Sequence, residues 1–473
     1  MNNSNHAPSR RDFLKTVGAV GAGLAAVSAA VPSARAQAAA ADAAAGTPAR
    51  PAGSRYMGGF AAPKLDKVRW GAIGVGARGS GHVEQFSQIE GSEIVAISDL
   101  YEDWANRAAN GIVKRGGKRP ELYFGSPEKY KELIARPDLD AIVIATPWED
   151  HAHMVIEAME AGKHAFVEVP MAFTIEDLWK IIDTSERTGK HAMMMENCNY
   201  NRDELMFLNM TRQNALGDLL HGEAAYLHPL CEQMKEVNRG TGSWRTKYYA
   251  QRHGGNLYPT HGLGPVAQYM NLVRTDDTFE RLVSFASPGF GRQQYAAAHF
   301  PPDHKWNQMK FECGDISTQI IKTRLGRTIM VQWDETTPRP YSRHDLLMGT
   351  RGVVAGYPQR AALEGLTEGT EDWSEAEKYA QLFEKYEHPL WKRMGALAVK
   401  MGGHGGMDFI MRSRIVECLR AGEPLDQNVY EGAMWSSVRP LSAKSESEGG
   451  APQTFIDFTR GDWKTTAPLG IVS

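Results

Sequence analysis

The sequence predicts an α/β protein in two parts. The first part is an N-terminal doubly wound parallel sheet, and the second is a C-terminal α+β domain with a largely antiparallel sheet. Apolar strands and helices alternate from residue 68 to residue 195, which is typical of a parallel sheet with a helix after each strand. After residue 201, strand-like segments follow one another with few helices between them. A chain of 473 residues is also long enough for two ordinary domains.

The first residues carry an export signal. A twin-arginine motif, Ser-Arg-Arg-Asp-Phe-Leu-Lys, occupies residues 9–15, and an apolar stretch from Val17 to Val31 follows it. Ala34-Arg35-Ala36 is a small-x-small cleavage site, so residues 1–36 are predicted to be a twin-arginine signal peptide. The apolar stretch is too short and too rich in Ala and Gly for a stable membrane span. We therefore expect a periplasmic mature protein without a membrane span.

Composition and charge argue against several kinds of partner. The formal net charge of −3 disfavours nucleic acid or an anionic membrane surface. The cysteines show neither metal-ligand spacing nor a disulfide framework, so we expect buried free thiols and no metal site. They are Cys198, Cys231, Cys313 and Cys418. Residues 37–63 are rich in Ala, Pro and Gly and are predicted to form a disordered linker or an extended arm.

A glycine-rich turn follows the first predicted strand, residues 68–73. The turn reads Gly74-Val75-Gly76-Ala77-Arg78-Gly79, and a helix is expected over residues 80–89. Glycines at these positions allow a tight turn and let the backbone approach a pyrophosphate at the helix N-terminus. The next strand, residues 93–99, ends in Asp99, where a carboxylate can accept hydrogen bonds from ribose hydroxyls. This combination indicates a Rossmann nucleotide site; the alternative is a glycine-rich loop in an unrelated α/β domain.

The acid at this strand end favours NAD over NADP, because a 2′-phosphate would be repelled. The neighbouring Arg78 weakens that preference slightly. We assign residues 64–200 to the NAD-binding domain and residues 201–473 to an α+β domain for substrate binding and oligomerisation.

The remaining elements of the first part alternate as a doubly wound sheet requires. Strands are expected at residues 122–124, 140–147, 165–170 and 191–196, and helices at 127–135, 151–162 and 174–188. Ligands of such sheets bind beyond the C-terminal ends of the strands. The candidates at these ends are Trp148, Glu149, Asp150, His151, Glu168, Val169 and Asn197. His151 stands beside two acids, but its place after a strand favours helix capping and cofactor contact over a metal site.

Beyond residue 201 the pattern changes to strands. A helix at residues 203–213 precedes a strand at 221–227, and further strands are expected at 281–285, 316–324, 327–333 and 345–349. Helices at residues 409–421 and 428–447 close the chain, and the second is expected to be broken or kinked at Pro440.

Two histidines are candidates for acid–base chemistry. His261 lies in a stretch dense in Gly, Pro and polar side chains and is a candidate general base, because imidazole titrates near neutral pH. Its alternative role is to hydrogen-bond backbone near a helix start. His404 lies between two glycine pairs, which suits a mobile acid–base loop or a plain flexible surface loop.

Four further side chains are candidates for holding a substrate. Tyr226, Tyr258 and Tyr341 can donate to sugar hydroxyls, or can serve as amphipathic core residues. Arg245 can hold a substrate carbonyl or carboxylate, or can form a structural ion pair.

Several motifs resemble the glucose–fructose oxidoreductase/inositol dehydrogenase family. They are the glycine turn, Ala145-Thr146-Pro147 followed by His151, the Ala161-Gly162-Lys163-His164 turn and the Glu168-x-Pro170 strand end. In the dehydrogenases of that family, a lysine that assists hydride transfer stands where this chain has Val169. Thr260 and Gly264 stand about where the family has its Asp and His. A net dehydrogenase would therefore lack its expected proton-handling residues.

One branch, glycoside hydrolase family 109, is similar over longer motifs. They are Trp148-Glu149-Asp150-His151, Glu168-Val169-Pro170, Glu196-Asn197-Cys198, Tyr226-Leu227-His228-Pro229 and the stretch from Gly255 to Gly262. The resemblance implies that NAD is held by Ala77, Arg78, Asp99, Trp148 to His151, Glu168, Val169 and Asn197, in addition to Gly74, Gly76 and Gly79 of the turn. It implies that the sugar is held by Tyr226, Arg245, Tyr258, Pro259, Thr260, His261 and Tyr341.

The resemblance also implies an activity, hydrolysis of terminal N-acetylgalactosamine without net redox change. Oxidation of the sugar at C3 acidifies the C2 proton, loss of that proton expels the group at C1, water adds, and C3 is reduced again. His261 or Tyr258 is assigned to the C3-hydroxyl and C2 protons, and His404 is the candidate acid–base at the leaving group. The alternatives are an NAD(P)-dependent sugar oxidoreductase with tightly bound nucleotide and a non-catalytic sugar-binding protein. A homo-oligomer is expected by analogy, through the open sheet face.

Overall fold

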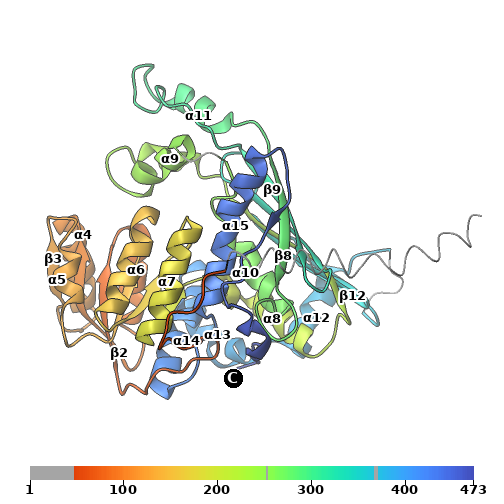
Figure 1. Cartoon of the computed structure of the whole chain (residues 1–473), viewed down its shortest axis with the longest axis horizontal. Coiled ribbons are helices and arrows are strands. Elements are labelled where there is room, and N and C mark those ends of the chain that lie inside the picture. Colours follow the sequence, from red (N-terminus) through yellow and green to blue (C-terminus); the bar gives the residue numbers. More distant parts are fainter. Residues whose placement is uncertain (1–46, 252–253, 367–370, 473) are drawn as a thin grey trace, which may run out of the picture. The chain divides into compact units, whose positions relative to one another are not determined.

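The first part of the chain folds as the expected parallel sheet with helices on its faces (Figure 1). The computed structural model describes residues 47–251, 254–366 and 371–472. The six strands lie in the order β3-β2-β1-β4-β5-β6, and every neighbouring pair is parallel. Their bounds are β1 Val68–Ile73, β2 Ser92–Asp99, β3 Glu121–Phe124, β4 Ala141–Ile144, β5 His164–Val167 and β6 Ala192–Met194.

The connecting helices are α3 Ala77–Phe86, α4 Glu102–Lys114, α5 Tyr130–Ile134, α6 His151–Glu160 and α7 Ile175–Thr188. Local signals define α7 clearly. The Thr174 side chain accepts a hydrogen bond from the Asp177 N–H, and Gly189 ends the helix in the left-handed conformation. The chain order reverses between β1 and β4, and such a switch point is where open α/β sheets bind ligands.

The second part contains an eight-stranded sheet in the order β13-β12-β11-β7-β10-β9-β8-β14. Only β7 and β10 pair in parallel, and the other neighbours are antiparallel. The expectation of a largely antiparallel sheet is therefore confirmed. The bounds are β7 Leu219–Leu227, β8 Phe279–Ala286, β9 Ile316–Thr323, β10 Thr328–Asp334, β11 Ser342–Gly349, β12 Gly352–Gly356, β13 Gln359–Leu363 and β14 Gln453–Thr454.

The helices of this part are α8 Arg202–Arg212, α9 Thr241–Gln251, α10 Thr260–Tyr269, α11 Gly291–His299, α12 Ala376–Tyr386, α13 Pro389–Met401, α14 Met407–Ala421 and α15 Val429–Ser447. Helices α10 and α15 pack on the sheet, against β7 and β8 respectively. The sequence predicts a break or a kink at Pro440; helix α15 is continuous through this proline, so the alternative of a break is wrong. An Asn428–Glu431 capping box starts the helix, and its burial along most of its length outweighs the one hydrogen bond that proline removes.

Part of the predicted arm packs on its own chain. The Arg50 guanidinium pairs with Glu186 on α7 at 3.1 Å and with Asp462 at 2.8 Å. The Tyr56 ring stacks on Tyr430 of α15 with 4.9 Å between centroids. Residues 49–63 thus follow the extended-arm alternative. The predicted signal peptide and residues 37–46 lie outside the described residues.

Cys198 and Cys418 are buried free thiols, as expected, and Cys313 is also buried. Cys231 is only half-buried, which departs from the expectation of buried thiols. Across the described residues, no helix combines the length and apolar character needed to cross a membrane.

Candidate functional site

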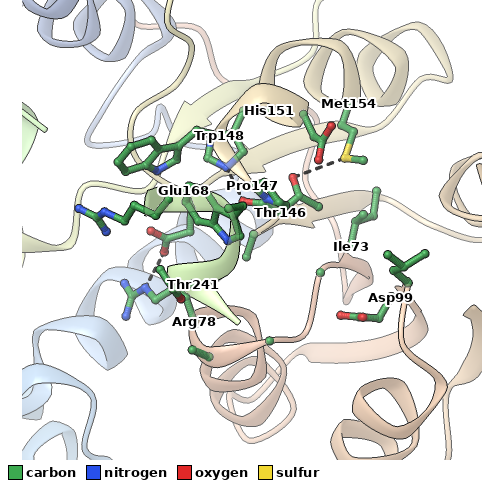
Figure 2. Close-up of a pocket in the computed structure, with 18 of the residues that line it drawn as sticks. Ile73, Arg78, Asp99, Thr146, Pro147, Trp148, His151, Met154, Glu168 and Thr241 are labelled. Atoms are coloured by element: carbon green, nitrogen blue, oxygen red, sulfur yellow. Dashed lines mark hydrogen bonds and ion pairs between the residues drawn. The ribbon is translucent and has the colours of Figure 1, made fainter. Parts of the chain in front are cut away.

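A cavity of about 820 Å³ lies beyond the C-terminal ends of β1, β4 and β5 (Figure 2). It extends from the glycine turn to α10 in the second part of the chain, so both parts contribute to its lining. Its volume lies in the upper part of the range of about 300–1,000 Å³ that is usual for small-molecule sites.

The glycine turn has the geometry that a pyrophosphate needs. Gly74 has φ +80°, and a Cβ there would lie 2.7 Å from the Ala145 carbonyl oxygen. A Cβ on Gly79 would lie 1.8 Å from the Gly74 carbonyl oxygen, so only glycine permits this approach of helix and turn. Helix α3 begins at Ala77 with no side-chain cap and no acid in its first turn. Its first N–H groups are therefore available to an anion.

Asp99 lies at the end of β2 and faces the same cavity. Its two carboxylate oxygens accept hydrogen bonds from the Val75 N–H at 2.7 Å and the Tyr101 N–H at 2.8 Å. Burial raises the pKa of this carboxyl, although the two N–H donors oppose the shift. Each oxygen keeps a second lone pair, so the carboxylate can also accept from ribose hydroxyls. The turn and this acid together fit a dinucleotide.

Arg78 connects the turn to a buried charge network. Its Nε donates to Glu168 at 2.7 Å, and its Nη1 donates to Asp408 on α14 at 2.5 Å. His82 also lies 2.7 Å from Glu168. Burial acts to raise the pKa of Glu168, but the positive charge of Arg78 and the bond to His82 hold it well below its usual value. Glu168 is thus a fixed carboxylate, with Val169 beside it in the cavity lining.

The segment after β4 forms one wall of the cavity. The Trp148 ring lies 5.1 Å from Trp244 and 5.2 Å from Phe173, centroid to centroid. His151 is fully buried, with Nδ1 2.8 Å from the Pro170 carbonyl and Nε2 3.1 Å from the Thr146 carbonyl. Burial lowers its pKa, so the neutral ring donates to one carbonyl at a time. His151 therefore supports the ends of β4 and β5 and does not cap α6.

The half of the cavity formed by the second part of the chain is an aromatic cluster, and we call it the sugar half because a sugar is predicted to bind there. The Tyr226 ring lies 4.7 Å from Tyr258, 5.1 Å from His261 and 6.1 Å from Tyr341, centroid to centroid. The Tyr226 hydroxyl and His228 Nδ1 are hydrogen-bonded at 2.8 Å. Burial lowers the pKa of His228 to about 4, so its ring is neutral, and its tautomer decides which of the two groups donates. The Tyr226 oxygen can still accept a hydrogen bond from a sugar hydroxyl.

His261 lies in the first turn of α10 and is paired with a buried acid. Its Nδ1 is 2.7 Å from Glu196 Oε1, and Glu196 is fully buried. Burial acts to raise the pKa of Glu196, but the charge and hydrogen bond of His261 hold it below its usual value. The carboxylate accepts the Nδ1–H, and Nε2 is left for the cavity, which His261 lines.

Arg245 lies against Tyr258 of this cluster. The Arg245 guanidinium forms a buried ion pair with Glu335 and lies 4.6 Å from the Trp148 ring and 5.0 Å from the Tyr258 ring. The structural ion pair expected as one alternative for Arg245 is present. Arg245 also lines the cavity, and its role in holding a substrate stays a prediction. Burial raises the pKa of Tyr258 well above its usual value, so its hydroxyl stays protonated.

His404 stands at the edge of the cavity in the loop between α13 and α14. The loop bends through successive positive φ angles, with Gly403 at 78°, His404 at 49° and Gly405 at 72°. The His404 side chain is 60% exposed, and its Nδ1 lies 3.0 Å from Asp408. Asp408 also accepts from Asn197 Nδ2 at 2.6 Å. His404 is thus tied to the same carboxylate as Arg78 and Asn197.

The cavity brings together most of the expected site residues. Those in its lining are Gly74, Gly76, Ala77, Arg78, Asp99, Trp148, Asp150, His151, Glu168, Val169, Asn197, Tyr226, Arg245, Tyr258, His261 and His404. Those outside the lining are Gly79, Glu149, Pro259, Thr260 and Tyr341. Gly79 packs closely against the Gly74 carbonyl of the turn, and the Tyr341 ring lies against Tyr226 and His228.

Sequence reasoning missed two contributions to the site. The first is Glu196. Its position directly before Asn197, after β6, could have marked it as a site residue, but nothing in the sequence indicates that it pairs with His261. The second is a bridge from the loop before α9 to the nucleotide half. The Arg239 guanidinium pairs with Asp103 at 2.6 Å and lies 4.6 Å from the Trp104 ring and 4.9 Å from the Tyr101 ring.

The neighbouring residues Gly240, Thr241, Ser243 and Trp244 line the cavity next to this bridge. Thr241 and Arg78 are both labelled among the lining residues in Figure 2. No sequence signal marks this loop as part of a nucleotide site.

Glu196, Cys198 and His261 place potential metal-ligand atoms within 4.8 Å of one another. Glu196 Oε1 already accepts from His261 and from the Cys198 N–H, and burial raises the pKa of the Cys198 thiol well above its usual value. A metal ligand would have to be a thiolate, which this environment disfavours. The expectation of no metal stays a prediction.

The glycine turn, the acid after β2 and the open strand ends define the class: a protein with an NAD-binding, oxidoreductase-type Rossmann domain. Residues 68–196 match the oxidoreductase family described as NAD-binding Rossmann fold, and residues 200–465 match the family described as glycosyl hydrolase 109, C-terminal domain. The chain belongs to glycosyl hydrolase family 109, and NAD is its cofactor.

Relatives of the same length support this assignment. Glycosyl hydrolase family 109 protein 1 of Akkermansia muciniphila is 59% identical over 484 residues, which cover 100% of both chains. A Shewanella oneidensis protein named alpha-N-acetylgalactosaminidase is 53% identical over 467 residues, which cover 99% of each chain.

Solved structures share the fold at low identity. An NAD binding oxidoreductase from Klebsiella pneumoniae has a TM-score of 0.63 at 15% identity, covering 83% of this chain and all of its own. A levoglucosan dehydrogenase in complex with NADH and levoglucosan has a TM-score of 0.62 at 17% identity, covering 82% of this chain and 99% of its own. These likenesses concern the fold alone.

Proposed function

We propose that this glycosyl hydrolase family 109 chain removes terminal N-acetylgalactosamine residues by oxidation, elimination, addition and reduction of the sugar. The observation that carries the proposal is the single cavity that joins the glycine turn to the Tyr226–Tyr258–His261 cluster, with Val169 in its lining. An aliphatic side chain there cannot handle the proton of a net alcohol dehydrogenation. The substrate follows the name of the Shewanella oneidensis relative.

The distribution of acids supports a mechanism other than direct displacement. Glycosidases that act without a cofactor mostly place two carboxylates across the scissile bond. Among the described residues that line the cavity, the acids are Asp99, Glu128, Asp150 and Glu168, and all belong to the Rossmann part. The sugar half offers phenol and imidazole groups in their place.

When bound, NAD supplies reversible hydride transfer at C3 of the sugar. His261 holds its Nδ1 proton against Glu196, so its Nε2 can take a proton from the C3 hydroxyl or from C2. Tyr258 stays protonated and donates a hydrogen bond to the developing C3 carbonyl, or exchanges a proton through His261. Tyr226 accepts from a sugar hydroxyl and orients the ring.

His404 is the proposed acid–base at the leaving group. Its exposed side chain lies at the edge of the cavity, where an aglycone would leave. Asp408 accepts its Nδ1–H and so leaves Nε2 to exchange a proton with the departing oxygen and then with the incoming water.

Export is part of the proposal. Twin-arginine export carries folded proteins, which suits an enzyme that must acquire its nucleotide inside the cell before it reaches the periplasm. A homo-oligomer formed through the open face of the second sheet is proposed by analogy alone.

The test is incubation of the purified protein with nitrophenyl α-N-acetylgalactosaminide in heavy water. We expect released phenol and deuterium at C2 of the sugar. Phenol without deuterium would overturn the elimination step, and no phenol from this or other glycosides would overturn the glycosidase. A stoichiometric rise in NADH absorbance with free sugar would instead support the alternative, a sugar oxidoreductase. His404→Ala should cut turnover and leave NAD in place; loss of NAD would refute its assigned role.

A further inference from the structure

We infer that Glu196 is a positioning residue for the reaction: it fixes the tautomer of His261 and stabilises the ring when that ring carries a proton. The inference rests on the proposed function and adds a residue that lies behind the cavity lining. Three features carry it: the short contact to His261, the rigid burial of the carboxylate, and the polar groups around its second oxygen.

The contact determines which nitrogen of His261 reacts. Glu196 Oε1 lies 2.7 Å from His261 Nδ1, and an ionised carboxylate can only accept, so the Nδ1 atom carries the hydrogen. Nε2 then has a free lone pair. Because His261 is in the cavity lining and Glu196 is not, the lone pair is available to the substrate.

Neighbouring groups hold the carboxylate in place. Glu196 Oε1 also accepts the Cys198 N–H at 3.1 Å, and the Glu196 main-chain carbonyl accepts from Gln427 Nε2 at 2.9 Å. Both partners are buried, as is Glu196 itself. A charged group fixed in a dry environment interacts more strongly with an adjacent imidazolium than an exposed one does.

The second oxygen of Glu196 lies among other buried polar atoms. Glu196 Oε2, the Thr260 hydroxyl and both amide atoms of Asn199 are buried and make no hydrogen bond of ordinary geometry among the described residues, although the nearby Thr260 hydroxyl helps to lower the pKa of Glu196. Gly264 packs closely against them, because a Cβ there would lie 2.8 Å from Asn199 Oδ1 and 3.0 Å from Glu196 Cγ.

The proton step balances without a further reactant. His261 Nε2 takes a proton from the sugar, the electron pair stays on the sugar, and the imidazolium is held between the substrate and Glu196. The carboxylate keeps its charge throughout, and the proton returns from Nε2 when the sugar is reduced again. Glu196 never touches the substrate.

The first test is a double-mutant cycle on the holoenzyme with Glu196→Gln, His261→Gln and the double variant. Glutamine keeps the shape of the glutamate but not its charge. We expect Glu196→Gln to lower kcat on the order of 10²-fold with little change in KM and full NAD content. The double variant should be no slower than His261→Gln, because Glu196 acts through that ring.

The second variant keeps the carboxylate and disturbs its position. Gly264→Ala introduces a methyl group against Asn199 and Glu196, and should lower kcat while NAD stays bound. It also serves if Glu196→Gln fails to fold. Glu431→Gln is the matched control. Glu431 is a buried acid that pairs with Arg274 at 2.7 Å, and neither residue lines the cavity. This variant should lower the melting temperature and leave kcat unchanged.

If the fold-losses in kcat of the two single variants multiplied in the double variant, or if Glu196→Gln changed KM alone, the inference would be overturned. The proposed glycosidase activity would be unaffected by either result. Failure of the proposed function is recognised separately, because the unmodified enzyme would then release no phenol.

Discussion

The two halves of the cavity are built in different ways. The nucleotide half depends on main-chain geometry within one continuous stretch, from Gly74 to Asp99, where missing Cβ atoms and free N–H groups form the site. The sugar half depends on side chains from β7, α10, the end of β6 and the 402–406 loop, which hydrogen bonds orient. Tyr226–His228 and His404–Asp408 are local pairs, whereas His261 and its partner Glu196 are 65 residues apart. In a main-chain site, one added methyl group at a key glycine is expected to abolish binding. In a side-chain site, replacing one side chain or its partner is expected to lower activity without abolishing binding.

The largest effect is expected in the turn itself. Gly79→Ala would place a methyl carbon 1.8 Å from the Gly74 carbonyl oxygen, so α3 must move away from the turn. We expect loss of bound NAD, measured by absorbance of the nucleotide released on denaturation. Gly81→Ala is the matched control on the same helix, because its Cβ would meet nothing within 4 Å. If Gly79→Ala retained NAD, the nucleotide half would not depend on main-chain geometry in the way that distinguishes it from the sugar half.

A smaller but still large effect is expected in the sugar half. His261→Gln removes the base without touching the turn, so kcat should fall by about 10²- to 10⁴-fold at unchanged NAD content. Steady-state kinetics on the nitrophenyl glycoside, with a cofactor assay on the same sample, checks this. Loss of NAD along with activity would mean that the two halves are not separable.

Acid should destabilise the protein through its buried neutral histidines. Burial lowers the pKa of His82 to about 4, so the folded state binds a proton there less readily than the unfolded chain. The free energy of unfolding should therefore fall as pH drops from 6.5 towards 4, by roughly 3 kcal/mol for such a shift. Melting temperatures across this range provide the measurement. His82→Gln should flatten the dependence, and an unchanged slope would assign the loss to other groups.

The smallest effect is expected at the bridge over the nucleotide half. Arg239→Ala removes an exposed ion pair with Asp103 and the contacts with Tyr101 and Trp104, so bound NAD should exchange several-fold faster with little change in kcat. Exchange of labelled NAD by rapid filtration measures this. Arg115→Ala removes an exposed pair with Glu84 and is the control, since neither residue lines the cavity.

The same contrast explains what the sequence could predict. The strand, turn and helix around Gly74 are local, so their periodicity and glycine spacing were enough to place the nucleotide half. His261 and Tyr258 stood out because they share one dense motif. The partner of His261 could not be predicted, because Glu196 is 65 residues away and its pairing depends on how α10 packs against the end of β6. The continuity of α15 through Pro440 likewise depends on burial and not on local propensity.

The buried network around Arg78 has a consequence for cooperativity of folding. Asp408 and Arg412 of α14 provide partners for Arg78, Asn197 and His82, all of which belong to the first part of the chain. A fragment that ends near residue 200 would leave these groups without their compensating charges and would gain no native-like stability from its intact sheet. Unfolding is therefore expected to proceed as one transition that involves both sheets, on either side of the predicted boundary at residue 200.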